Sequence, residues 1–145
     1  MAEYKVNGYL RSDKMYTHGG SLSDCISFIV NNIFSQCQKY EEPILLYHVY
    51  KTHKSKINPT HWTHKYGFVV KHSALNTIIE IRDEEKGECE FIAIDKVVFE
   101  RIQLDLIVQL SNTIYNMIKN KHLTGMEVSL MQTFEDDGRG YWHDV

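Results

Sequence analysis

Apolar positions along the chain recur with two different periods, and these periods predict the order of its elements. Short segments rich in alternating or β-branched apolar residues indicate strands, whereas apolar residues three and four positions apart indicate helices. The resulting order is β-α-β-β-β-β-α-β. We therefore predict a single α+β domain, residues 1–145, with a mostly antiparallel sheet of about five to six strands and two helices packed on it.

The first helix is predicted to begin at Ser21 and to end near Tyr40. Ser21 is a favourable N-cap, and Asp24 stands three residues later, at the spacing of a capping box. The second helix is predicted from Lys96 to about Lys121, with apolar residues at helical spacing throughout. Further apolar residues lie outside its main stripe, namely Val97, Val98, Leu104 and Ile107. Because such a helix favours burial on a second side, we expect at least a homodimer.

Six segments have the composition of strands: Tyr4–Arg11, Ile44–Lys51, Tyr66–His72, Thr77–Arg82, Glu88–Ile94 and Met126–Phe134. The fourth and fifth segments predict a hairpin, in which Gly87 can adopt a positive φ. The polar segment Ser12–Gly20 ends in two glycines and predicts a loop.

Composition is typical of a folded globular protein, with 43% hydrophobic and 24% charged residues. The first residues lack the apolar core of a signal peptide, and no segment reaches transmembrane length, so we expect a soluble, cytoplasmic protein without a membrane partner. Cys25 and Cys37 stand at apolar positions of the first helix, which indicates buried, reduced thiols. No cofactor is expected. Frequent Ile, Lys, Asn and Tyr are typical of AT-rich genomes, including those of phages.

Charge is distributed unevenly along the chain. The 37 residues from Pro43 to Ile79 contain five lysines, five of the eight histidines and no acidic residue. The remaining eleven basic and nineteen acidic residues lie elsewhere, so this segment carries +5 and the rest of the chain −8. Such asymmetry indicates an anionic partner, although a basic surface facing the acidic segment that follows would produce the same pattern.

Aromatic residues are interspersed with the basic ones in this segment. Aromatic rings stack on bases while lysines and histidines contact phosphates, which is how nucleotides and single strands are commonly held. Trp62 lies between two histidines in a segment that reads as a polar loop and is the first residue expected to stack. We predict one positive surface with Trp62 at its edge, and ligand contacts from Tyr50, Lys51, Lys54, Lys56, His61, Trp62, His64 and Lys65. The alternative is that Tyr47 and Tyr50 are core residues.

The entry to the first helix is a second candidate anion site. Free backbone N–H groups and the helix dipole favour an anion there, and Gly19 and Gly20 would allow a phosphate to approach closely. Arg11 and Lys14 lie nearby in the sequence and would add positive charge, and His18, which precedes the glycines, is a further candidate for ligand contact. The alternative is an ordinary capped helix that follows a loop.

His61 and His64 form an HxxH pair, which can hold a metal ion from one turn of chain. No HExxH, CxxC or suitably spaced carboxylate completes a set of three or four ligands, so we predict no metal site. The sequence also contains no GxSxG, Walker or GxGxxG motif.

Three tripeptides have the form His-x-Ser/Thr, and they begin at His53, His61 and His122, with hydroxyls at Ser55, Thr63 and Thr124. Two such tripeptides resemble the signature of the 2H phosphoesterase group. The resemblance implies that paired histidines act as general acid and base on a phosphodiester, while the hydroxyl holds the phosphate. In that group each tripeptide lies within a strand, whereas His61 is expected here in a polar loop and His122 at a helix end.

Three hypotheses about function follow from these patterns. The leading one is a protein, conceivably phage-encoded, that senses or sequesters a small anionic ligand, nucleotide-like or a short single strand, without turnover. The first alternative is a metal-independent phosphodiesterase that uses His122 with His53 or His61. The second is a protein-binding inhibitor or immunity-type protein that uses the acidic tail and the hairpin at Asp83–Glu90.

Overall fold

The computed structural model describes residues 3–11, 13–52, 61–101 and 103–120. These residues form six strands and three helices: β1 (Tyr4–Leu10), β2 (Asp13–Gly20), α1 (Leu22–Lys39), β3 (Ile44–Thr52), β4 (Trp62–His72), β5 (Asn76–Asp83), β6 (Glu88–Asp95), α2 (Lys96–Arg101) and α3 (Gln103–Asn120). The strands make one sheet in the order β2-β1-β3-β4-β5-β6, and every neighbouring pair is antiparallel. The predicted α+β class, with helices packed on an antiparallel sheet, is confirmed.

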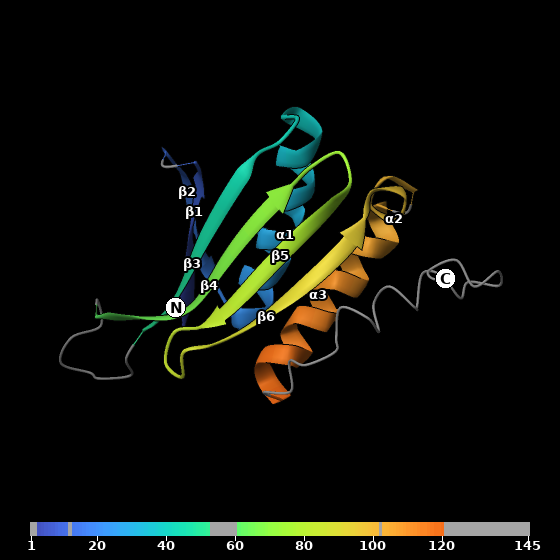
Figure 1. Ribbon diagram of the computed structural model, residues 1–145. Coiled ribbons are helices and arrows are strands. Elements are labelled where there is room, and N and C mark those ends of the chain that lie inside the picture. Colours follow the sequence, from blue (N-terminus) through green and yellow to red (C-terminus); the bar gives the residue numbers. More distant parts are fainter. Residues whose placement is uncertain (1–2, 12, 53–60, 102, 121–145) are drawn as a thin grey trace.

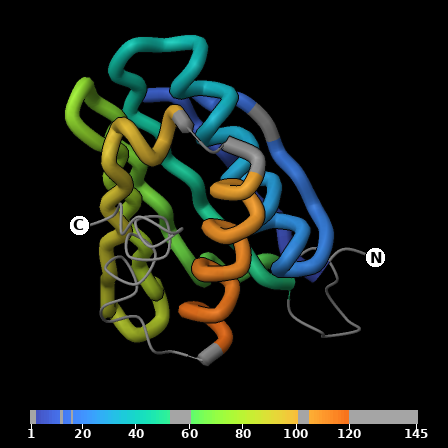
Figure 2. The backbone as a smooth tube through the Cα atoms, turned by 90° about the vertical axis from the view of Figure 1, so that its right-hand side faces the viewer, coloured from blue at the N-terminus to red at the C-terminus, as the bar shows by residue number. Residues whose placement is uncertain are grey.

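The two long helices lie on the same side of the sheet (Figure 1). Helix α1 contacts β1, β2 and β3, and α3 packs beside α1 (Figure 2). No described helix is both long enough and apolar enough to cross a membrane. The side of the sheet that faces away from α1 and α3 is called the open face below.

A continuous apolar core fills the space between the helices and the sheet. Alternate strand residues enter it, because successive side chains of a strand point to opposite faces. Among them are Val6 of β1, Tyr47 of β3, Phe68 of β4 and Ile81 of β5, all buried. The Tyr47 hydroxyl donates a 2.7 Å hydrogen bond to Oδ1 of Asn32 in α1, so the buried polar group is satisfied.

The predicted capping box at the start of α1 and the predicted positive φ of Gly87 in the β5–β6 hairpin are confirmed. The Asp24 backbone N–H donates to Ser21 Oγ at 3.1 Å, and the Ser21 N–H donates to the Asp24 carboxylate at 3.2 Å, which is the predicted capping box. Gly87 has a φ of 77° in the β5–β6 turn, a value that glycine adopts readily. The Asp83 carboxylate accepts hydrogen bonds from two backbone N–H groups of this turn and fixes its shape.

Three predicted boundaries were wrong. The loop predicted up to Gly20 is instead a strand over its described residues, since Asp13–Gly20 pairs with β1 as the edge strand β2. Strand β4 begins at Trp62, four residues before the predicted Tyr66. The second helical segment begins at Lys96 as predicted but consists of two helices, α2 and α3. The predicted strand Met126–Phe134 lies outside the described residues.

The pairing of β3 with β4 contains a β-bulge. Val49 lies opposite Tyr66, but the next residue of β3, Tyr50, lies opposite His64, so Lys65 is the extra residue on β4. The bulge shifts the register, so that the first residues of β4, Trp62–His64, lie opposite Tyr50–Thr52 of β3.

Candidate functional site

The register of the sheet gathers aromatic and basic side chains on the open face. In β1 the residues that alternate with the buried Val6 are Lys5 and Asn7, and they lie opposite Tyr50 and His48 of β3. Tyr50 in turn lies opposite His64 of β4. We call the resulting set the open-face cluster; it consists of Lys5, Tyr9, His48, Tyr50, Trp62 and His64.

The rings of the cluster contact one another across three strands. The His48 ring lies edge-on to Tyr9, with centroids 5.6 Å apart, and to His64, with centroids 4.6 Å apart. The Tyr50 and His64 rings are tilted with respect to each other at 5.0 Å. Each of these side chains is half-buried, so ring surface remains accessible from the open face. The cluster is therefore an aromatic platform rather than a pocket.

One lysine lies over the edge of this platform. Lys5 Nζ is 4.7 Å from the centroid of the Trp62 ring and 5.6 Å from that of Tyr50, within the range of cation–π interactions. Among the residues that the structure describes, no ion pair joins Lys5 to a carboxylate. Its charge is thus available to an anion that approaches the two rings.

A polar chain fixes the position of Tyr50. The Thr17 hydroxyl donates to Asn7 Oδ1 at 2.9 Å, which orients the Asn7 amide so that its NH₂ group points away from β2. Burial raises the pKa of the Tyr50 hydroxyl, and the neighbouring Tyr9 adds to this, whereas a hydrogen bond with the Asn7 side chain acts in the opposite direction. The phenol is therefore neutral at physiological pH and is held by β1.

Two histidines of the cluster are in direct contact. His48 Nδ1 lies 3.0 Å from His64 Nε2, and His64 Nε2 also lies 3.1 Å from the backbone carbonyl oxygen of Tyr66. Burial lowers the pKa of His48, and the adjacent His64 lowers it further, while Glu84 acts in the opposite direction. His48 is therefore neutral at pH 7 in the free protein.

The structure brings together only some of the residues that the sequence indicated. Tyr50, Trp62 and His64 meet in the open-face cluster, but Lys5 and His48 were not predicted to join them. Alternation around Val6 and Val49 would have assigned these two residues to an exposed face. It could not have shown that β1 lies beside β3, because pairing between distant strands has no local signal.

The positive surface of Lys51, Lys54, Lys56 and Lys65 stays a prediction, because the structure describes only Lys51 and Lys65. Lys51 lies opposite Thr63 on the helix side of the sheet, and its ammonium lies 5.7 Å from the Tyr4 ring centroid. Lys65 forms an ion pair with Glu85, with the two atoms 2.5 Å apart. Five further candidates lie outside the described residues: His53, Lys54, Lys56, His122 and Thr124.

The entry to α1 does not have the features of an anion site. Gly19 and Gly20 belong to β2, and the helix start is already occupied by the Asp24 carboxylate, which would repel a phosphate. The capping hydrogen bonds from Ser21 lower the pKa of Asp24, so it is ionised. His18 stacks on Phe28 of α1 at 4.2 Å on the helix side of the sheet. Arg11 lies in the β1–β2 turn with a φ of 59°.

No group of three metal-ligating side chains is present within the described ranges of the chain. His61 precedes β4, and its carbonyl oxygen accepts a 3.4 Å hydrogen bond from Thr52. His64 points into the open-face cluster instead of pairing with His61 around a common centre. The predicted burial of two cysteines is confirmed, and burial raises the pKa of Cys25 to about 11 and that of Cys37 to about 12. Both thiols are therefore protonated and poorly nucleophilic.

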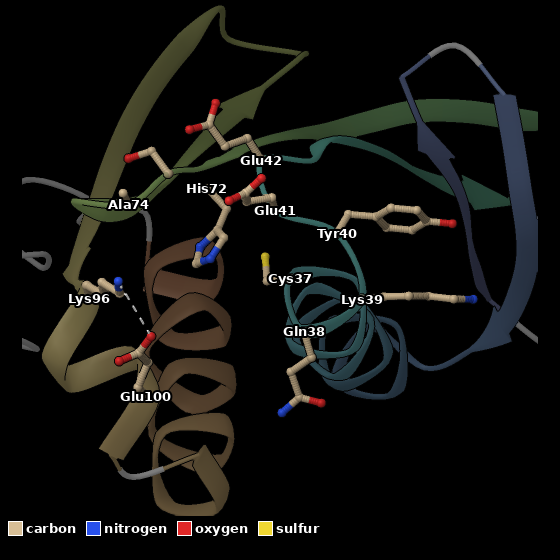
Figure 3. Close-up of a pocket in the computed structure, with 11 residues that line it drawn as sticks. Cys37, Gln38, Lys39, Tyr40, Glu41, Glu42, His72, Ala74, Lys96 and Glu100 are labelled. Carbon is tan, nitrogen blue, oxygen red and sulfur yellow. Dashed lines mark ion pairs between the residues drawn. The ribbon is translucent and has the colours of Figure 1, made fainter.

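A separate pocket of about 420 Å³ lies at the opposite end of the sheet, between the end of α1, the β4–β5 turn and α2 (Figure 3). His72 and Cys37 lie within it, and Lys96 and Glu100 form a 4.0 Å ion pair at its side. Its charged residues carry both signs, and no residue predicted to bind a ligand lines it. The open-face cluster is the better candidate, because it combines accessible rings with a cation that has no described carboxylate partner.

Comparison of the chain with family models, with curated proteins and with solved structures finds no match. Function is therefore inferred from the geometry of the open-face cluster.

Proposed function

We propose that this protein binds a short single-stranded oligonucleotide, or a nucleotide with the same groups, on the open face of its sheet without turning it over. The observation that carries the proposal is the position of the Lys5 ammonium over the Trp62 and Tyr50 rings. Bases stack on exposed aromatic rings, and a flexible lysine beside them meets the phosphates. Such a ligand uses both the aromatic rings and the ammonium group of the cluster.

The shape of the site supports a strand rather than a deeply enclosed small molecule. The cluster spans β1, β3 and β4 on a face that no described helix covers, and its rings are half-buried rather than enclosed. An extended ligand can lie across such a surface with successive bases on successive rings, as single-strand binding surfaces do. Because stacking tolerates any base, we expect weak sequence preference.

Binding of a fluorescently labelled oligothymidylate, followed by anisotropy, tests the proposal. Trp62→Ala is expected to remove about 1–3 kcal/mol of binding free energy, because one base loses its stacking partner. Lys5→Gln is expected to weaken binding and to reduce its dependence on salt, because a phosphate contact releases counterions. Phe91→Ala is the matched control, since Phe91 is an exposed ring on β6 outside the cluster.

Two results would contradict the proposal. One is an absence of oligonucleotide and nucleotide binding at low salt by the folded protein. The other is tight binding that Trp62→Ala and Phe91→Ala leave equally unchanged, which would place the ligand elsewhere. Cleavage of the oligonucleotide in EDTA would favour the phosphodiesterase hypothesis, whose residues His53 and His122 lie outside the described chain. A protein ligand whose affinity followed the acidic hairpin would favour the inhibitor hypothesis.

A further inference from the structure

The two histidines of the open-face cluster share a hydrogen. His64 Nε2 is within hydrogen-bonding distance of two atoms, the Tyr66 carbonyl oxygen and His48 Nδ1. A carbonyl oxygen can only accept, so the arrangement that satisfies both contacts places a proton on His64 Nε2 and leaves His48 Nδ1 as an acceptor. In this neutral pair, His48 carries its proton on Nε2 and His64 keeps a lone pair on Nδ1.

Charged and titratable groups surround the pair on each side. From β1, Tyr9 contacts the His48 ring, and Lys5 lies over Tyr50, the ring next to His64. From the turn after β5, the Glu84 carboxylate extends over Gly67, since a Cβ at Gly67 would come within 2.8 Å of Glu84 Oε2. Gly67 lies directly opposite His48, so Glu84 is the nearby acidic group.

These neighbouring charges act on the protonation of the pair in opposite directions. A proton added to the neutral pair would place a positive ring beside Lys5, and this opposes protonation in the free protein. A single exposed carboxylate, Glu84, compensates only in part. An anion held between the pair and Lys5 would favour the singly protonated pair, because it would interact with the imidazolium ring and with the lysine at once.

We infer that the His48–His64 pair receives a phosphodiester group of the bound strand and takes up one proton as it does so. This inference rests on the proposed function and adds a pH dependence to it. Below the pKa of the bound pair, protonation and anion binding support each other, and above it the pair is neutral and contributes only one N–H group. Affinity is therefore expected to rise as pH falls.

Titration of the full chain with oligothymidylate at constant ionic strength tests the inference. Its phosphodiesters do not titrate near neutrality, so a pH effect reports on the protein. Uptake of one proton can change affinity by up to about tenfold per pH unit. We expect roughly tenfold tighter binding at about pH 5.5 than at about pH 7.5. Calorimetry in two buffers of different ionisation enthalpy should show the uptake of close to one proton.

Substitutions separate the pair from other histidines. His48→Gln and His64→Gln should each flatten the pH profile, whereas His72→Gln, at the opposite end of the sheet, should leave it unchanged. If a variant of the pair fails to fold, NMR titration of the ring protons in the unsubstituted protein gives the same information. There the midpoint of the pair should move upward when the oligonucleotide is bound.

The outcomes are distinguishable from those of the proposed function. Tight binding that is independent of pH, without proton uptake, would overturn the proton-linked pair and leave the stacking platform intact. A pH effect that persists equally in both His→Gln variants would also overturn it. Absence of binding at every pH would overturn both proposals together.

Discussion

At the scale of single residues, the surroundings of His72 link its protonation to the stability of the fold. It lies at the end of β4, where its Nδ1 is 2.6 Å from the Thr77 hydroxyl and its ring lies 4.9 Å from that of Phe99. Burial lowers the pKa of His72, and Lys96 lowers it further, while Glu100 and Glu42 act in the opposite direction. The neutral ring is therefore part of the folded structure.

This predicts a loss of stability in mild acid. Because the pKa of His72 is lower in the folded chain than in the unfolded one, the unfolded chain binds a proton more readily. The free energy of unfolding should fall as pH drops below about 6.5, and this contribution should level off below the folded-state pKa. Urea unfolding at several pH values measures the effect. His72→Gln should make the profile shallower than the control His61→Gln does, and equal profiles would contradict the assignment.

Residues of the candidate site differ in how visible they were in the sequence. Trp62 stood out because a large aromatic residue lay among polar ones, and the structure places it in the open-face cluster. Lys5 was not visible, since nothing near it in the sequence is unusual. Its importance comes from the pairing of β1 with β3, which brings it beside Tyr50. Contacts between residues more than forty positions apart cannot be read from local patterns.

At the scale of elements, the start of α1 is set by side chains rather than by burial. The reciprocal hydrogen bonds between Ser21 and Asp24 satisfy the backbone N–H groups of both residues at an exposed helix end. The same carboxylate lies close to Gly20, where an added Cβ would come within 3.0 Å of it. The turn from β2 into α1 therefore depends on both a capping hydroxyl and a small residue.

Ser21→Ala is accordingly expected to destabilise the protein. Loss of the capping hydroxyl typically costs about 0.5–2 kcal/mol of unfolding free energy. Ser35→Ala is a suitable control, because Ser35 is an exposed residue within α1, where alanine is the better helix former. Chemical denaturation with both variants measures the difference. Equal stabilities would show that the hydrogen bond from Asp24 contributes nothing.

Elements with strong periodicity were predicted well, and polar edge elements were not. Helix α1 and strands β3, β5 and β6 have one side in the core, so their apolar residues follow a clear period. Strand β2 lies at the sheet edge, pairs only with β1 and ends in two glycines, so it reads as a loop. The polar residues at the start of β4 likewise predict a loop.

At the scale of the whole molecule, apolar surface remains on the helical side. Val97 of α2 and Val108 of α3 are 60% and 58% exposed. Val98, also in α2, is buried in the core. Exposed aliphatic residues on neighbouring helices favour association. The homodimer stays a prediction; of the residues on which it was based, Val97 is exposed and Val98 has its contacts within the chain.

Light scattering coupled to size-exclusion chromatography tests the assembly. We expect a mass of at least twice 17.0 kDa at micromolar concentration. Val108→Glu should shift the equilibrium toward the monomer, because a carboxylate in an apolar interface loses its hydration. Glu100→Gln is the control on an exposed polar position nearby. A mass of 17.0 kDa for the unsubstituted chain would show that it does not self-associate under these conditions.

The bulge at Lys65 has a genetic consequence. Tyr66 and His64 are two positions apart and would share a face in a regular strand, but the extra residue sends His64 and Trp62 to the open face and Tyr66 toward the helices. Removing the Lys65 codon would make His64 the direct neighbour of Tyr66, and strict alternation would then keep both side chains on the faces they already occupy. Removing the Thr63 codon instead would send Trp62 to the helix side, so a descendant sequence could lose the platform in one deletion while every residue that builds it is retained. Inheritance of this surface depends on the length of β4 as much as on its composition.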